Sequence, residues 1–183
     1  MIDTTFSLMI EEFWYNVTMF KSILKPDCII ASFSELPVDT LVGRFPLALV
    51  DCDNTLIFKT SHTINEEGVS WMLEYQKKGG TVVLISNNAH PIFKTLTKHL
   101  DCELYEVAFK PISLYYRKIL QKHHRTSQQV MVIGDQLLTD ILGGKLHHFY
   151  TIYHKPLTSK DVGYNGVIRR IEKKWIEDYE QHM

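Results

Sequence analysis

The fold is most constrained by an alternation of short apolar runs with longer stretches that carry helix signals. The Gly79-Gly80 pair stops one such stretch before the next apolar run, and Pro91 stands where another helix would begin. Strands that alternate with helices in this way build a mostly parallel sheet covered on both faces. We therefore predict an α/β, three-layer Rossmann-like fold with strands at 46–50, 81–85, 104–108, 130–133 and 149–153, and helices at 65–78, 91–100, 112–123 and 137–146.

Composition places the chain among ordinary globular proteins, with 183 residues, 45% hydrophobic and 22% charged. A net charge of −1 gives no general attraction to nucleic acid, so we expect no nucleic-acid partner. Three cysteines without CxxC spacing argue against a disulfide framework or structural zinc and favour the reducing cytoplasm. No cleavable signal is evident, and no apolar run approaches the roughly 20 residues needed to span a bilayer.

Two carboxylates end the apolar run at 47–50, namely Asp51 and Asp53. Alternate side chains of an extended backbone project to the same side, so both carboxylates would face one small volume. Two like charges at this separation need a cation between them, or a proton on one of them. The pair therefore suits a metal-assisted nucleophile with a neighbouring acid–base group.

Polar side chains also follow the next three predicted strands. Because ligands collect at the carboxyl ends of parallel strands, these side chains should meet the two carboxylates at one edge of the sheet. They are Ser86, Asn87, Asn88, Lys110, Asp135 and, shortly after, Asp140.

This set of residues matches the needs of phosphoryl transfer, which depends on positioning and on neutralising charge around phosphorus. Asp51, Asp135 and the backbone carbonyl of Asp53 could hold Mg2+ through hard oxygen ligands. Asp51 would attack phosphorus and become an aspartyl-phosphate. Asp53 would protonate the leaving oxygen and then activate the hydrolytic water.

The remaining residues have predicted supporting roles. Ser86, with amides at Asn87 and Asn88, would bind the phosphoryl oxygens, and Lys110 would neutralise charge on the phosphate and on the nucleophile. Asp140 would orient Lys110 or the metal's waters from behind. Its alternative is a purely structural role in a helix.

The motif positions resemble, in order, the four motifs of the haloacid-dehalogenase (HAD) superfamily: Asp51-x-Asp53-Asn54-Thr55, Ser86-Asn87-Asn88, Lys110-Pro111 and Gly134-Asp135-x4-Asp140. The block 134–144 looks like a narrower group, the class IIIA, YqeG-type phosphatases related to mitochondrial phosphatidylglycerophosphate phosphatases. Leu24-Lys25-Pro26-Asp27 is similar to that group's opening, whereas Cys52 and Lys145 depart from its pattern. The resemblance implies a Mg2+-dependent phosphomonoester hydrolase and, as substrate, phosphatidylglycerophosphate in phospholipid biosynthesis.

Cap domains of that superfamily are inserted after the first motif or between the second and third. Segments 56–80 and 89–109 leave no room for one, so we expect no sizeable cap and an open site. An open site suits a bulky substrate such as a lipid headgroup. The alternatives are a phosphatase for a soluble phosphometabolite, a phosphotransferase, and a non-catalytic HAD-fold binding or scaffold protein.

The two ends form separate predictions. Residues 1–24 have apolar positions at helical spacing and form an amphipathic extension ahead of a phosphatase domain at 25–183. That helix would pack on its own domain or on a second subunit, with a lipid interface as the alternative. The stretch 167–179 is also amphipathic, and its basic residues form either a solvated face or a peripheral contact with the cytoplasmic face of a membrane: Arg169, Arg170, Lys173 and Lys174.

Overall fold

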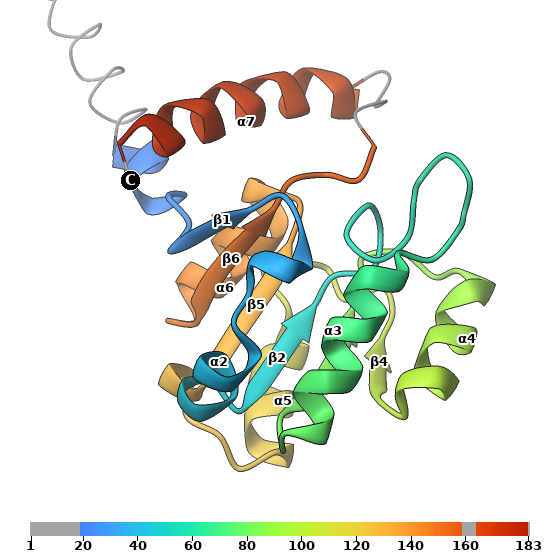
Figure 1. The fold of residues 1–183 in the computed structure, drawn as a ribbon. Helices are drawn as coiled ribbons and strands as arrows, with labels where there is room; N and C mark the ends of the chain where they lie inside the picture. The colour runs from blue at the N-terminus through green and yellow to red at the C-terminus, as the bar shows by residue number, and fades with distance from the viewer. Residues whose placement is uncertain (1–18, 159–163, 183) are drawn as a thin grey trace, which may run out of the picture.

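The chain is described here by a computed structural model over residues 19–158 and 164–182. Its centre is a sheet of six parallel strands in the order β1-β6-β5-β2-β3-β4 (Figure 1). This arrangement confirms the predicted α/β fold with a parallel sheet. The strands are β1 (Cys28–Ile30), β2 (Leu47–Val50), β3 (Thr81–Ile85), β4 (Glu103–Tyr105), β5 (Val130–Gly134) and β6 (Tyr150–His154).

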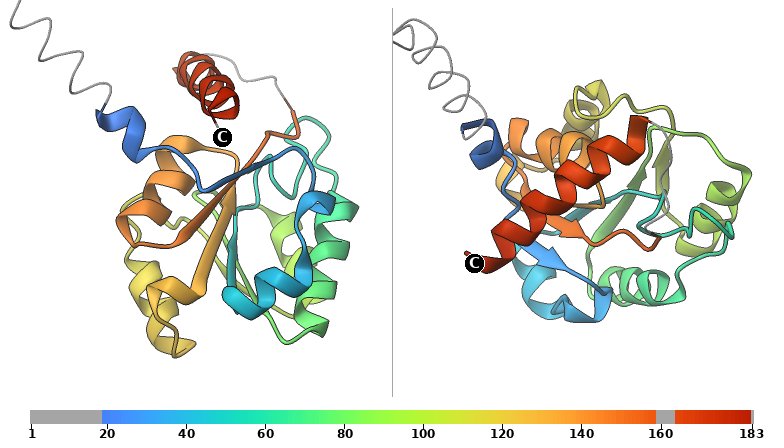
Figure 2. Two further views of the ribbon diagram at one scale, coloured as in Figure 1. Left: turned by 60° about the vertical axis from the view of Figure 1, so that its left-hand side comes forward. Right: turned by 90° about the horizontal axis from the view of Figure 1, so that it is seen from above.

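Helices cover both faces of the sheet, which gives the three predicted layers (Figure 2). One layer holds the 3-10 turn η1 (Phe33–Glu35) with α2 (Val38–Arg44), α3 (Glu66–Lys77) and α4 (Pro91–Leu100). The opposite layer contains α5 (Leu114–Lys122) and, beyond the 3-10 turn η2 (Ser127–Gln129), α6 (Leu142–Leu146). A π-helical turn, η3 (Leu137–Ile141), joins β5 to α6.

The strands are apolar throughout because they are buried on both sides. In β2, Ala48 and Val50 belong to the core cluster under α3, whereas Leu47 and Leu49 belong to the cluster under α5. Side chains that alternate between two buried faces produce a continuous apolar run rather than an alternating one. This is why β2 could be located from sequence almost to the residue.

Local signals also fix α4, which the sequence predicted with the observed bounds. Pro91 occupies the first helical position, where a missing N–H costs nothing, and Asp101 ends the helix in the left-handed conformation with φ 45°. The helix predicted at 137–146 is instead the π turn η3 followed by α6.

The third predicted strand requires a correction. Residues 104–108 were expected to be extended, but β4 ends at Tyr105, and positive φ values at Val107 (50°) and Phe109 (56°) turn the chain away. The next helix starts at Leu114, later than expected, where Ser113 caps it by accepting a hydrogen bond from the Tyr115 amide. The motif lysine therefore lies in a connecting loop and not directly behind a strand.

The last helix, α7 (Tyr164–Gln181), lies across the edge of the sheet where β6 ends, as Figure 2 shows from above. Residues 19–24, at the end of the predicted extension, pack on it. Lys21 pairs with Asp178 at 2.6 Å, and Phe20 meets Trp175 edge to face at 6.4 Å between ring centroids. Packing on the protein's own domain therefore holds for these residues, while residues 1–18 lie outside the described part of the chain.

Membrane crossing has no support in the described residues, among which no helix combines the length and the apolar character that a bilayer span requires.

Candidate active site

A buried lysine joins two of the predicted site carboxylates. The Lys110 Nζ lies 2.5 Å from Asp51 Oδ1 and 2.6 Å from Asp140 Oδ1, and it also donates to the Ile85 carbonyl at 3.0 Å. Burial disfavours the ammonium charge, but Asp140 and Asp51 outweigh burial and raise the pKa of Lys110 well above its usual value. The lysine is therefore a fixed positive charge directly behind Asp51.

Asn87 places that lysine. Its side chain accepts a hydrogen bond from the Lys110 amide at 2.7 Å and donates one to the Lys110 carbonyl at 3.1 Å. These two bonds hold the Asn87 side chain against the loop, and the phosphate-binding role of Asn87 stays a prediction.

Asp53 belongs to a different set of partners. Its Oδ2 accepts hydrogen bonds from Ser86 Oγ at 2.9 Å and from Asn88 Nδ2 at 3.0 Å. The Asn88 amide in turn donates to Ser86 Oγ at 3.0 Å. The two carboxylates of the first motif thus stand in unlike surroundings, one against a buried cation and the other against neutral donors.

Three acidic side chains converge beside the lysine. Carboxylate oxygens of Asp51, Asp135 and Asp140 lie within 4.8 Å of one another, and all three residues are buried. Burial raises the pKa of Asp51 well above its usual value, although Lys110 opposes this effect. Hard oxygen donors crowded at this distance fit a divalent cation such as Mg2+, which would relieve the repulsion among them.

Asp140 reaches this cluster because the strand beside it ends in glycine. A Cβ on Gly134 would lie 2.4 Å from the Asp140 carboxylate carbon, so no larger residue fits there without displacing the acid. The other carboxylate oxygen of Asp140, Oδ2, accepts a hydrogen bond from the Gln136 amide at 3.1 Å. The sequence left open whether Asp140 orients Lys110 or has a purely structural role in a helix. In the structure, Asp140 contacts Lys110.

Arg169, which the sequence placed on a basic face of the last helix and not in the site, lies over the same cluster. Arg169 of α7 donates hydrogen bonds to both the carboxylate and the backbone carbonyl of Asp135. Burial raises the pKa of Asp135 to about 7, while Arg169 acts to lower it. Glu172, one helical turn further on, lies 3.5 Å from Arg169 and accepts a hydrogen bond from the Leu138 amide at 3.1 Å.

Arg169 corrects two expectations. A solvated face is wrong for this residue, although Lys173 on the same helix is 77% exposed. The site is also less open than predicted, because α7 covers its Asp135 side. One signal in the sequence was the acidic Glu172 three residues after Arg169, at a spacing that allows an ion pair within a helix. The structure buries Glu172 and leaves the Arg169 side chain 14% exposed.

A smaller link connects the first motif to the end of β6. Asn54, with φ 62°, accepts hydrogen bonds from the Thr158 amide at 2.8 Å and hydroxyl at 2.6 Å, and donates to the Thr158 carbonyl at 3.0 Å. A left-handed backbone is tolerated best by glycine and asparagine, which accounts for an Asn directly after Asp53.

Six of the predicted residues surround one hollow of about 40 Å³, which suits a small anion rather than a whole organic ligand, while Ser86 and Asp140 do not line it. Gln136 and Thr139 line it as well, although the sequence did not indicate them. Its lining consists of Asp51, Asp53, Asn87, Asn88, Lys110, Asp135, Gln136 and Thr139.

Comparisons with known proteins agree with this geometry. Residues 107–153 match the model of a family described as HAD-hydrolase-like. The chain is 27% identical over 157 residues to the "Probable phosphatase YqeG" of Bacillus subtilis (strain 168), a match covering 85% of this chain and 91% of that protein.

Two solved structures share the fold. One is a hypothetical protein of Xanthomonas campestris, with 21% identity, a TM-score of 0.51, and coverage of 64% of this chain and 69% of the other. The second is the 3-deoxy-D-manno-octulosonate 8-phosphate phosphatase of Yersinia pestis, with 13% identity, a TM-score of 0.51, and coverage of 78% and 86%. The parallel sheet, the four motifs at its carboxyl edge and these matches together make the chain similar to HAD-type phosphatases.

Proposed function

We propose that the protein is a Mg2+-dependent phosphomonoester hydrolase that works through an aspartyl-phosphate at Asp51. The observation that carries this proposal is the unlike surroundings of the two first-motif carboxylates. Asp51 lies against the Lys110 ammonium at 2.5 Å, and Asp53 against Ser86 and Asn88. One group is thereby arranged to face an anion and the other to exchange a proton. Similarity to the Bacillus subtilis protein supports the same activity.

In the first half of the reaction, an Asp51 oxygen attacks phosphorus while the bond to the leaving oxygen breaks. Asp53 gives its proton to that oxygen, so the product leaves as an alcohol. The Lys110 charge and the Asn87 backbone amide would hold the phosphoryl oxygens. Asp51 and Asp135, with the Asp53 carbonyl, would hold Mg2+, which supplies positive charge against the phosphate.

In the second half, Asp53 takes a proton from water, whose oxygen attacks phosphorus. The bond to Asp51 breaks, inorganic phosphate leaves, and both carboxylates return to their starting states. Asp140 acts through Lys110, which it contacts at 2.6 Å, and is a positioning residue.

On the strength of the resemblance to the YqeG-type group, phosphatidylglycerophosphate is the first substrate to test, beside a soluble phosphometabolite. Phosphate release should be measured from this lipid in mixed micelles and from a panel of soluble phosphomonoesters, with Mg2+ and with EDTA. Release from soluble esters together with none from the lipid would contradict the lipid assignment and favour a soluble phosphometabolite.

Asp51→Asn tests the reaction itself. We expect it to lower turnover on the order of 10^4-fold or more, because no other group can form the covalent intermediate. Asp39→Asn is the matched control, since Asp39 is 83% exposed on α2 and should leave turnover unchanged. Turnover that survives Asp51→Asn would refute the assignment of the nucleophile.

A further inference from the structure

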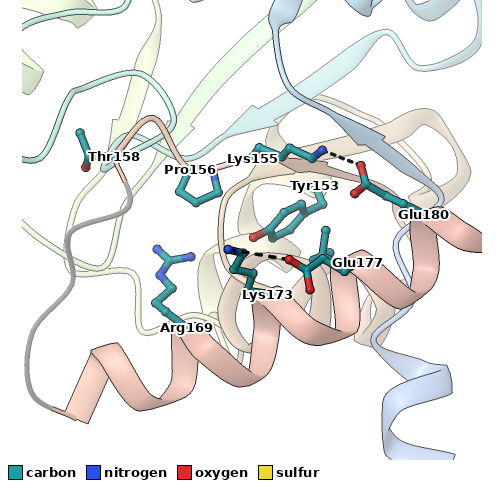
Figure 3. A pocket seen from close by; sticks show the side chains of 9 residues that line it. Tyr153, Lys155, Pro156, Thr158, Arg169, Lys173, Glu177 and Glu180 are labelled. Carbon is teal, nitrogen blue, oxygen red and sulfur yellow. Dashed lines mark ion pairs between the residues drawn. The ribbon is translucent and has the colours of Figure 1, made fainter.

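A second and larger cavity lies beside the catalytic hollow. It has a volume of about 310 Å³ and lies, open to solvent on one side, between α7 and the segment that follows β6 (Figure 3). Its lining combines three mostly apolar side chains with charged and polar ones. The apolar members are Tyr153, Pro156 and Ile176, and the others are Lys155, Thr158, Arg169, Lys173, Glu177 and Glu180.

One end of this cavity adjoins the catalytic motifs. Figure 3 shows Arg169 and Thr158 at that end, with Lys155 and Glu180 at the other. Arg169 is hydrogen-bonded to Asp135, and Thr158 is held by Asn54, the residue after Asp53. At this end, Arg169 contacts the predicted metal ligand directly, and Thr158 contacts the residue that follows the acid–base group in the sequence.

The interior of the cavity is apolar and its rim is charged. Tyr153 and Ile176 are buried side chains that present carbon surface to the cavity. The rim consists of ion pairs, Lys155–Glu180 at 2.6 Å and Lys173–Glu177 at 3.8 Å. Exposed pairs of this kind are weakly held, so they can rearrange around an incoming group.

We propose that this cavity binds the organic part of the substrate, the alcohol that remains when the phosphoryl group is transferred to Asp51. The volume is at the lower end of the range for ligand sites, roughly 300–1,000 Å³. The group it takes is therefore compact and largely apolar, the size of one ring or a short branched chain, which favours a soluble phosphometabolite over phosphatidylglycerophosphate, whose diacyl lipid is too large for the cavity. This inference rests on the proposed function, since it assumes that the phosphoryl group enters the smaller hollow.

Two phosphonates that cannot be hydrolysed test the inference by binding alone. Phenylphosphonate and methylphosphonate carry the same anionic head, and only the phenyl group can fill the cavity. Titration calorimetry of the full chain with Mg2+ should show phenylphosphonate binding roughly tenfold tighter or more, because a ring buries additional apolar surface.

Filling the cavity should remove this preference. Ile176→Trp places a larger side chain in the cavity, and Lys173→Trp does so from the rim, where the side chain is 77% exposed and folding is not at risk. Ile171→Trp is the matched control, because Ile171 lies on the same helix, is 47% exposed and does not line the cavity. We expect both cavity variants to bind the two phosphonates within about twofold of each other, and the control to keep the wild-type ratio.

The outcomes separate this inference from the proposed function. Equal binding of the two phosphonates by the wild type, or a preference that survives both cavity variants, overturns the inference even if phosphomonoesters are hydrolysed. A preference that disappears in the cavity variants supports it even if no phosphomonoester is turned over, in which case the proposed hydrolase activity fails instead.

Discussion

At the scale of single residues, Lys145 explains why this chain departs from the pattern of the group it resembles. Its ammonium lies 2.7 Å from Asp27 Oδ1, while Asp27 Oδ2 accepts hydrogen bonds from the Thr151 amide and hydroxyl, both at 2.7 Å. Asp27 thus joins the segment before β1 to β6 and α6. Lys145, which departs from the pattern of that group, is thus the ion-pair partner of Asp27 in the segment Leu24-Lys25-Pro26-Asp27.

Asp27 should make the free energy of unfolding depend on pH in the acidic range. Burial by itself would raise the pKa of Asp27, but Lys145 and Thr151 hydrogen bonds lower it below the usual value of 3.8. A depressed folded-state pKa means that the stabilisation is complete above about pH 4 and is lost as the pH falls through the folded value. The free energy of unfolding should therefore differ between wild type and Asp27→Asn by a constant amount near pH 6, and by less below pH 4. Urea titrations at several pH values measure this, and a difference that stays constant down to pH 2.5 would contradict it.

Two ion pairs of the same length should contribute differently to the free energy of unfolding, because one is buried and the other is exposed. Lys110 lies 2.5 Å from Asp51 with both side chains at most 8% exposed, and Lys78 lies 2.5 Å from the 83% exposed Asp39. Lys110→Met leaves carboxylates buried without their counter-charge and should cost about 3–5 kcal/mol of unfolding free energy. Lys78→Met is the control and should cost less than about 1 kcal/mol. Similar losses in chemical denaturation would contradict the expected effect of burial on these two ion pairs.

At the scale of elements, the sequence predicted correctly those helices and strands whose positions depend on residues close together in the chain. Apolar runs located β2 and β3, because a strand that is buried on both faces is apolar at every position. Pro91 located α4, because a helix start depends on the residues next to it in the sequence. The strand β1 and the helix α2 were missed: β1 has three residues and α2 has seven, too few to establish a period. The role of Arg169 in the site was missed for another reason. Its contact with Asp135 spans 34 residues of sequence and depends on how α7 crosses the sheet.

The packing of α6 against the sheet gives a prediction of its own. A Cβ on Gly144 would lie 2.5 Å from Val132 Cγ1 and 2.7 Å from Thr151 Cγ2, so α6 approaches β5 and β6 too closely for any side chain. Gly144→Ala should destabilise the protein by about 1–3 kcal/mol through this clash. Gly43→Ala is the control, because nothing lies within 4 Å of its Cβ position in α2, and it should stabilise by about 0.5–1 kcal/mol. Equal effects in thermal denaturation would contradict the close approach.

At the scale of the whole molecule, the acidic cluster should couple cation binding to folding. A ligand that binds only the folded state at about 100 times its dissociation constant adds about 2.7 kcal/mol to the free energy of unfolding. We therefore expect Mg2+ to raise the melting temperature relative to EDTA, and Asp135→Asn to remove most of that rise, because Asp135 is one of the three converging carboxylates. A wild-type melting temperature that does not respond to Mg2+ would exclude a metal site in the folded protein.

The order of the strands also has a consequence for synthesis on the ribosome. Among the described strands, β1 comes first in the chain and pairs only with β6, so Cys28 finds its partner residue Ile152 only after most of the chain has been made. By contrast, β2, β3 and β4 lie side by side in the order in which they are made and can pair while the chain is still growing. Asp51, Asp53, Ser86 and Lys110 thus emerge well before Asp135 and Asp140. The nascent chain holds an incomplete site until β5 takes its place beside β2, and its first strand stays unpaired until nearly the last.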